Sequence, residues 1–143
     1  MEHPKSIGDR STLAIMLALQ ARGLPFLVPF GENTRYDLAV ELGGRLVRVQ
    51  CKTGRPRGSV VEFKVCSSYA HLPSPRARGR HYEGEVDYFA IYCPQASGVY
   101  LIPIGDVPNR WTGSLRLEPT RNQQRLGVRY ASDYEIGKVR IET

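Results

Sequence analysis

The sequence lacks the features that mark several classes of protein. Its 3 cysteines, Cys51, Cys66 and Cys93, lie far apart and are odd in number, which argues against a disulfide framework, and no CxxC spacing indicates a zinc site. No apolar run approaches the roughly 18 residues of a membrane span, and the first residues do not read as a signal peptide. No glycine-rich phosphate loop is present, so a nucleotide cofactor is not implied. We therefore expect no disulfides and no membrane association, and a cytoplasmic location.

Acidic residues are fewer than basic ones. The chain has 20 Lys and Arg against 14 Asp and Glu, a formal net charge of +6. A basic domain of this size often meets polyanions, and nucleic acid is the partner that this balance favours. With 143 residues, of which 41% are hydrophobic, residues 1–143 are expected to form a single domain with its own core.

The periodicity of apolar residues predicts a helix followed by several strands. The helix opens at Ser6 or Gly8 and ends at Gly23. This order, one helix followed by several strands and further C-terminal segments, indicates an α/β (α+β) domain around one mixed sheet. Between 67 and 85 lies a long polar segment, which in a compact domain is more often functional than filler. The expected strands are Pro25–Phe30, Tyr36–Glu41, Arg45–Lys52, Val60–Cys66, Val86–Cys93, Val99–Ile104 and Ser114–Leu117, with a break at Gly54–Gly58.

The clearest hairpin is the one that turns at Gly43-Gly44. With a two-residue loop, paired residue numbers sum to 87, so Asp37 faces Gln50 with Cβ atoms roughly 5 Å apart. Alternation then gives the hairpin an apolar face and a polar face, and the polar face carries Asp37, Gln50 and Lys52. An ordinary surface hairpin would also show such a polar face.

What favours chemistry is the combination of groups at the open end of this hairpin. Divalent magnesium takes hard oxygen ligands, a few from protein and the rest from water and phosphate. Asp37 and Gln50 offer such oxygens, and a metal held there could polarise a phosphate and generate hydroxide. The ammonium group of Lys52 could orient the attacking water or stabilise the charge that develops on the phosphate.

Two segments carry a family resemblance. The runs Pro29–Asp37 and Val49–Gly54 resemble PD-(D/E)XK nucleases, most of all the group I intron-associated homing endonuclease branch and, more distantly, archaeal Holliday-junction resolvases. The likeness continues through Val86–Pro94, Val99–Pro103 and Asn122–Gln124, and so covers most of the chain. It implies a restriction-endonuclease-like domain, with a mixed central sheet flanked by helices, that cleaves DNA with Mg²⁺ or Mn²⁺.

The resemblance also implies roles for particular residues. Asp37 is the metal-binding acid, the carbonyl of Cys51 completes the metal site, and Lys52 matches the motif lysine. Gln50 stands where most members carry a second acid, although glutamine occurs in the intron-associated branch. The family often has a glutamate in the first helix, four residues after a glycine; counted from Gly8 that position is Thr12.

Two acids are therefore candidates to replace that first-helix glutamate. Asp9 is the nearest acid in the helix, one turn before Thr12. Glu32, in the loop before the hairpin, is the further candidate.

Several arginines are candidates for DNA binding, because Arg binds phosphate bidentately. Those that flank the site or cluster in the long polar segment are Arg35, Arg55, Arg57, Arg76, Arg78 and Arg80. The alternative to DNA binding is that each of these arginines is a solvated charge in a loop. Cutting both strands of a duplex calls for two active sites, so a homodimer or higher homo-oligomer is expected.

Two other functions stay open at this point. A Holliday-junction resolvase on the same fold would share the motif and differ in substrate shape. A non-catalytic DNA-binding protein would carry Gln50 and the missing helix glutamate as marks of a decayed site.

Overall fold

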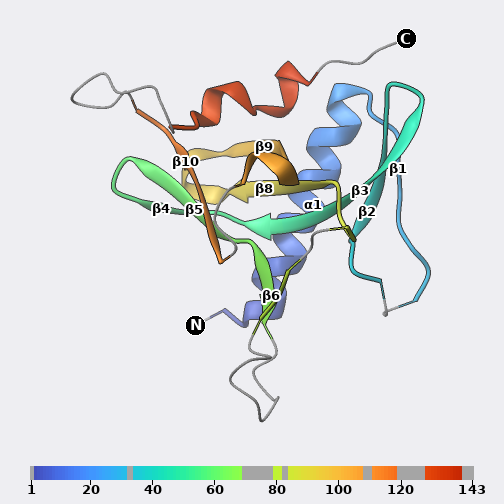
Figure 1. The fold of residues 1–143 in the computed structure, drawn as a ribbon, viewed down its shortest axis with the longest axis horizontal. Coiled ribbons are helices and arrows are strands. Elements are labelled where there is room, and N and C mark those ends of the chain that lie inside the picture. Colours follow the sequence, from blue (N-terminus) through green and yellow to red (C-terminus); the bar gives the residue numbers. More distant parts are fainter. Residues whose placement is uncertain are drawn as a thin grey trace.

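A computed structural model describes residues 2–31, 34–68, 79–81, 84–107, 111–118 and 128–139, with the backbone alone at 66–68 and 79–81 (Figure 1). In these ranges, no helix is both long and apolar enough to pass through a bilayer.

Helix α1 spans Pro4–Arg22 and opens the fold. The His3 side chain caps it by accepting the Lys5 N–H at 3.1 Å, and Pro4 suits the first turn, where a missing N–H costs nothing. Gly23 ends it in the left-handed conformation, with φ 80°. The predicted end is confirmed, and the start lies earlier than predicted because His3 and Pro4 form the cap.

The predicted mixed sheet forms the centre of the fold and has five strands. Its strand order is β1-β2-β3-β8-β9, with β3 and β8 parallel and the other neighbours antiparallel. The first strand is shorter than the predicted Pro25–Phe30, because the chain leaves the sheet before Pro29, and Phe30 is fully exposed. The strands are β1 Phe26–Leu27, β2 Leu38–Leu42, β3 Arg45–Thr53, β8 Tyr88–Cys93 and β9 Gly98–Pro103.

A second sheet, in the order β10-β5-β4, packs on the central sheet. The predicted break of the hairpin strand is confirmed, since β3 ends at Thr53 and Gly54 follows outside it. What the sequence did not predict is that Arg55–Arg57, within the break, pairs with β5 as a strand of another sheet; Pro56 is tolerated there because β4 is an edge strand. Part of the long polar segment is also paired, β7 with β6. These strands are β4 Arg55–Arg57, β5 Val60–Lys64, β6 Cys66–Ser68, β7 Gly79–His81 and β10 Thr112–Arg116. Short 3₁₀ helices are η2 Pro94–Ala96, η3 Ile104–Asp106, η4 Ala131–Asp133 and η5 Ile136–Lys138.

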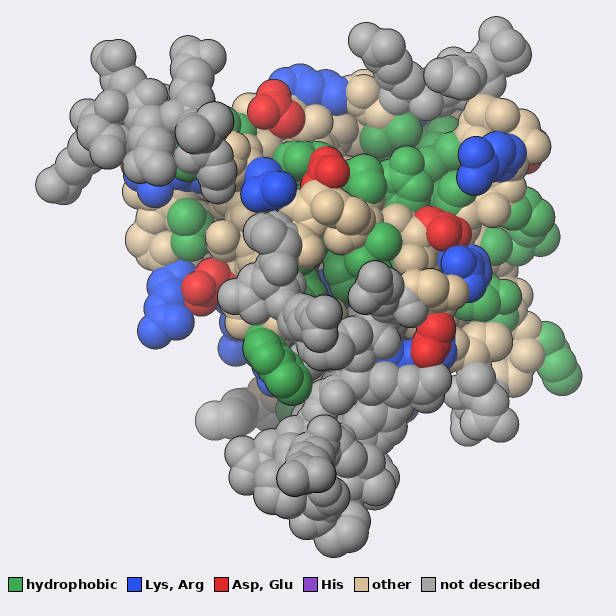
Figure 2. Space-filling view, viewed as in Figure 1, with side chains coloured by type: hydrophobic (Ala, Val, Ile, Leu, Met, Phe, Trp, Pro, Cys, Tyr) green, Lys and Arg blue, Asp and Glu red, His purple; other side chains and the backbone are tan. Residues whose placement is uncertain are grey.

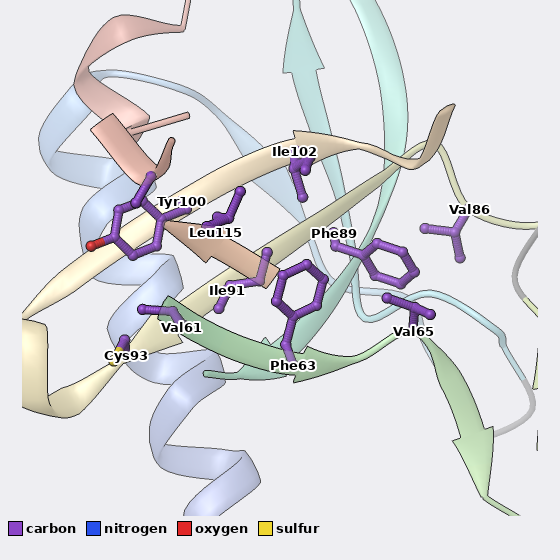
Figure 3. Close-up of a cluster of buried hydrophobic side chains, with 11 residues drawn as sticks. Val61, Phe63, Val65, Val86, Phe89, Ile91, Cys93, Tyr100, Ile102 and Leu115 are labelled. Atoms are coloured by element: carbon purple, nitrogen blue, oxygen red, sulfur yellow. The ribbon is translucent and has the colours of Figure 1, made fainter. Parts of the chain in front are cut away.

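The central sheet is buried on both faces, which gives two cores. On one face Ile15 and Leu19 of α1 pack on Val40 and Val49. On the other face the second sheet contributes Val61, Phe63 and Leu115. Figure 3 shows this second core, in which the rings of Phe63 and Phe89 lie 6.2 Å apart at 56°. The α/β class is therefore confirmed. The expected flanking helices are found on one face only, where α1 packs, because the second sheet covers the other face.

Gly54 joins the two sheets directly after β3. Its N–H donates to the carbonyl of Tyr92 at 2.8 Å, which keeps it against β8. A Cβ there would lie 2.5 Å from Cγ1 of Val61 and 2.8 Å from Cγ2 of Ile91, so a side chain does not fit. This close approach brings the end of β3 next to the second sheet.

Candidate active site

The β2–β3 hairpin has the predicted register. Its turn is Gly43-Gly44, with φ 58° and 77°, and the pairs run from Leu42↔Arg45 to Leu38↔Val49. Val49 and its alternating neighbours face α1. Gln50 and Lys52 therefore project from the opposite face of β3.

Asp37 lies one residue before β2. Its N–H donates to the carbonyl of Val49 at 2.9 Å, and its Oδ2 accepts the N–H of Cys51 at 2.9 Å. Both contacts tie Asp37 to the residues on either side of Gln50. The ladder continued by one step places Asp37 opposite Gln50, in agreement with the register predicted from the glycine turn.

The charge of Asp37 is held in a partly dry environment. Burial raises the pKa of its carboxyl group, and the Cys51 N–H and the nearby positive charge of Lys52 act in the opposite direction. A carboxylate that water solvates poorly and hydrogen bonds hold in place is a good ligand for a cation, because the cation supplies the missing solvation.

Helix α1 is attached to the end of β3 beside this carboxylate. The hydroxyls of Ser11 and Thr53 lie 2.6 Å apart and share a hydrogen bond. One residue on, Thr12 interacts with the thiol of Cys51, whose pKa is raised by burial and by the charge of Asp37. The thiol therefore stays neutral, and the carbonyl is the group that Cys51 can offer to a metal.

Asp9 shares a hollow with Asp37. This hollow, of about 570 Å³, lies between α1 and the segment before β2, and Asp9, Thr12, Tyr36 and Asp37 are among the residues that line it. Asp9 is exposed and pairs with Lys5 at 3.6 Å. The structure thus brings Asp9 to the same side of the site as Asp37. The other candidate, Glu32, falls outside the described residues.

The oxygens that these residues offer are of types that a hard divalent cation accepts. Asp37 has a half-buried carboxylate, Gln50 an amide oxygen and Cys51 a backbone carbonyl, and Mg²⁺ and Mn²⁺ accept all three as ligands. Across the described ranges, no three His, Cys, Asp or Glu side chains gather to share a metal ion. Water and substrate phosphate would have to supply the remaining ligands.

The predicted DNA-binding arginines differ in their surroundings. Arg35 forms an ion pair with Glu85 at 2.6 Å, and the side chains are only 19% and 29% exposed. Arg57 contacts Glu62 at 3.3 Å, and Arg55 is exposed on β4. Arg76 and Arg78 lie outside the described residues, as does the side chain of Arg80. A role in DNA binding stays a prediction for all of them.

Two features of the site were not foreseen. Asp87 accepts the Arg48 N–H at 2.7 Å and binds its guanidinium at 3.2 and 3.3 Å, which fixes β8 against β3 beside Gln50. Lys64 lines the same hollow as Lys52. The first depends on the pairing of β3 with β8 and the second on the packing of the two sheets, and the sequence carries no local signal for either.

Comparisons with known proteins identify the family and the fold. The model of the PD-(D/E)XK endonuclease family matches residues 2–137. A solved structure of a bacterial homing endonuclease, I-Ssp6803I, is similar in fold, with a TM-score of 0.63 and 22% sequence identity, covering 94% of this chain and 88% of that one. Among curated proteins, no match was found.

Proposed function

The chain belongs to the PD-(D/E)XK endonuclease family, and we propose that it hydrolyses phosphodiester bonds of duplex DNA with Mg²⁺ or Mn²⁺ bound at its β2–β3 hairpin. One observation carries the proposal. The half-buried carboxylate of Asp37 is bound to the backbone of β3 between Gln50 and Lys52, where the family has its acid and its lysine.

Four residues at the open end of the hairpin have a part in this reaction. Asp37, Gln50 and the carbonyl of Cys51 would hold the cation. When bound, the cation supplies polarisation of the phosphate and activation of water. Lys52, whose charge already interacts with Asp37, stabilises the negative charge that grows on the phosphate oxygens. Asp9, on the other side of the shared hollow, could bind a water molecule of the metal.

We propose cleavage of duplex DNA rather than resolution of four-way DNA junctions. The resemblance of the fold to a bacterial homing endonuclease supports it, although at 22% identity that likeness concerns the fold alone. A nicking assay on supercoiled plasmid beside a four-way junction of the same sequence separates the two activities. Equal binding without cleavage of either substrate would instead favour the non-catalytic alternative.

A homodimer or higher homo-oligomer belongs to the same proposal, because a duplex has two strands to cut. The outer side of α1 supports association with a second copy. Leu13 and Leu17 are 65% and 69% exposed, and residues 12–21 contain no charged side chain. In a chain with net charge +6, an uncharged surface is where two copies can meet without repulsion.

The activity itself is tested by plasmid nicking in a magnesium and manganese series. We expect Asp37→Asn and Lys52→Ala each to abolish nicking, since one removes the ligand charge and the other the stabilising ammonium. Asn can still accept the Cys51 N–H, so the fold is preserved. Matched controls are Asp133→Asn and Lys138→Ala, which remove the same charges from residues at another hollow. Nicking by Asp37→Asn at the wild-type rate would show that the metal site has been assigned to the wrong residues.

A further inference from the structure

The second sheet turns a polar face away from the core. Along β5, Val61 and Phe63 are buried, so the residues between and beside them point outward. The pairing Arg55↔Glu62 places β4 side chains on the same outward face, and Thr112↔Lys64 does so for β10. The outer face of the second sheet therefore presents Arg55, Arg57, Glu62, Lys64, Thr112 and Ser114.

This face continues into the active site through a hollow. The hollow, of about 560 Å³, is lined by Lys52 at the end of β3 and by Arg55, Glu62 and Lys64 of the second sheet. Pro4, at the start of α1, also lines it. The lysine of the proposed active site and the outer face of the second sheet thus share one open space.

The hollow carries an excess of positive charge. Among the described residues that line it, the only acid is Glu62, whose carboxylate contacts Arg57 at 3.3 Å. Within the described part of the chain, neither Arg55 nor Lys64 has an ion-pair partner. Three cations in one hollow repel one another, and a polyanion offsets that repulsion.

In other parts of the described surface, basic side chains have acids beside them (Figure 2). Figure 2 shows Lys and Arg side chains lying beside Asp and Glu on the face in view. The hollow between the β2–β3 turn and the C-terminal segment is an example, since Arg45 and Lys138 line it together with Asp87 and Asp133.

We propose that Arg55 and Lys64 bind the DNA phosphates that flank the scissile phosphate, so that the cut strand passes from Lys52 onto the outer face of the second sheet. The inference rests on the proposed endonuclease function and says along which surface the substrate lies. Contacts of this kind carry no sequence information and fix the register of the strand. Among the predicted arginines it favours Arg55 over Arg35, whose guanidinium is occupied by Glu85.

The test is a salt titration of DNA affinity. Fluorescence anisotropy with a short duplex, in Ca²⁺ so that binding is not followed by cleavage, gives the slope of log K against log salt. The double variant Arg55→Ala/Lys64→Ala should lower that slope by about two units, one for each lost phosphate contact. The loss of affinity should be the same for unrelated duplex sequences. The variant Arg55→Lys/Lys64→Arg, which keeps both positive charges, should retain most of the wild-type slope.

The matched control is Arg45→Ala/Lys138→Ala, which removes the same net charge from the balanced hollow. It should keep the wild-type slope. An unchanged slope in the Arg55/Lys64 variant overturns the proposal, because no phosphate contact has then been lost. An equal loss of slope in the control also overturns it, because the net charge of the protein alone would then explain the effect. Failure of this proposal is distinct from that of the nuclease assignment, because the latter is decided by nicking with wild type and Asp37→Asn.

Discussion

Gln50 is the residue at which this chain departs from the carboxylate that most of its family carries, and replacing it by glutamate tests the site directly. Gln50→Glu changes one amide to a carboxylate of the same shape, so packing is preserved. The new charge would lie cross-strand from Asp37, whose carboxyl group already has a raised pKa because of burial. Without a cation the variant should therefore be less stable than wild type.

The size of this effect follows from the spacing of the hairpin. Cross-strand neighbours lie about 5 Å apart, and two charges at that distance repel by about 3 kcal/mol at an effective dielectric constant of about 20. Attraction to Lys52 offsets part of this, which leaves a loss of about 1–2 kcal/mol. For a chain of this length that corresponds to a melting temperature lower by about 2–8 °C in EDTA.

Divalent cations should reverse the order of stability. A second carboxylate raises the charge of the ligand set, and a tenfold tighter metal affinity adds about 1.4 kcal/mol of stability at saturation. The shift in melting temperature between EDTA and Mg²⁺ or Mn²⁺ should therefore be larger in Gln50→Glu than in wild type, which is expected to bind metal weakly without DNA.

Thermal unfolding in EDTA and across a metal series measures both effects. Gln20→Glu adds the same charge to an exposed position near the other end of α1 and should leave the metal-dependent shift at its wild-type value. If Gln50→Glu melts like wild type in EDTA and gains no additional stability from metal, Gln50 does not lie beside the Asp37 carboxylate, and the assignment of the metal site to this hairpin is wrong.

Two further predictions concern stability and assembly. The Arg48 guanidinium lowers the pKa of Asp87, so the pair stabilises the fold above the ordinary pKa of Asp and this contribution is lost as pH falls through the lowered value. Urea unfolding should show wild type more stable than Asp87→Asn by about 1 kcal/mol or less at neutral pH, because the pair is half-exposed. The difference should shrink as pH falls through the lowered pKa of Asp87, and a difference independent of pH would contradict a charge effect. Leu17→Lys should convert a wild-type dimer to monomer in light scattering after size exclusion, whereas Leu46→Lys, at an exposed leucine of β3, should not; a dimer in both would place the interface elsewhere.

The part of the fold that could be predicted from the sequence is the part specified by local signals. Gly43-Gly44 determined the turn, and with it the register that aligns Asp37 with Gln50. Gly23 determined the end of α1 in the same way. The prediction was wrong at an edge position. Pro56 was expected to lie between strands, but it lies in β4, which tolerates a proline because an edge strand has a neighbour on one side only.

Contacts between distant segments could not be predicted, and they determine what surrounds the hairpin. Arg48 meets Asp87 because β3 and β8 are parallel neighbours, and Arg55 reaches the hollow of Lys52 because Gly54 lets the chain pass between two sheets. In the sequence, Arg35, Arg55 and Arg57 are equivalent arginines near one motif. In the structure, Arg35 and Arg57 each form an ion pair with a glutamate, whereas Arg55 lines the hollow of the proposed catalytic Lys52. The residues of the proposed metal site thus come from one hairpin, whereas the proposed path of the substrate depends on how the second sheet packs against it.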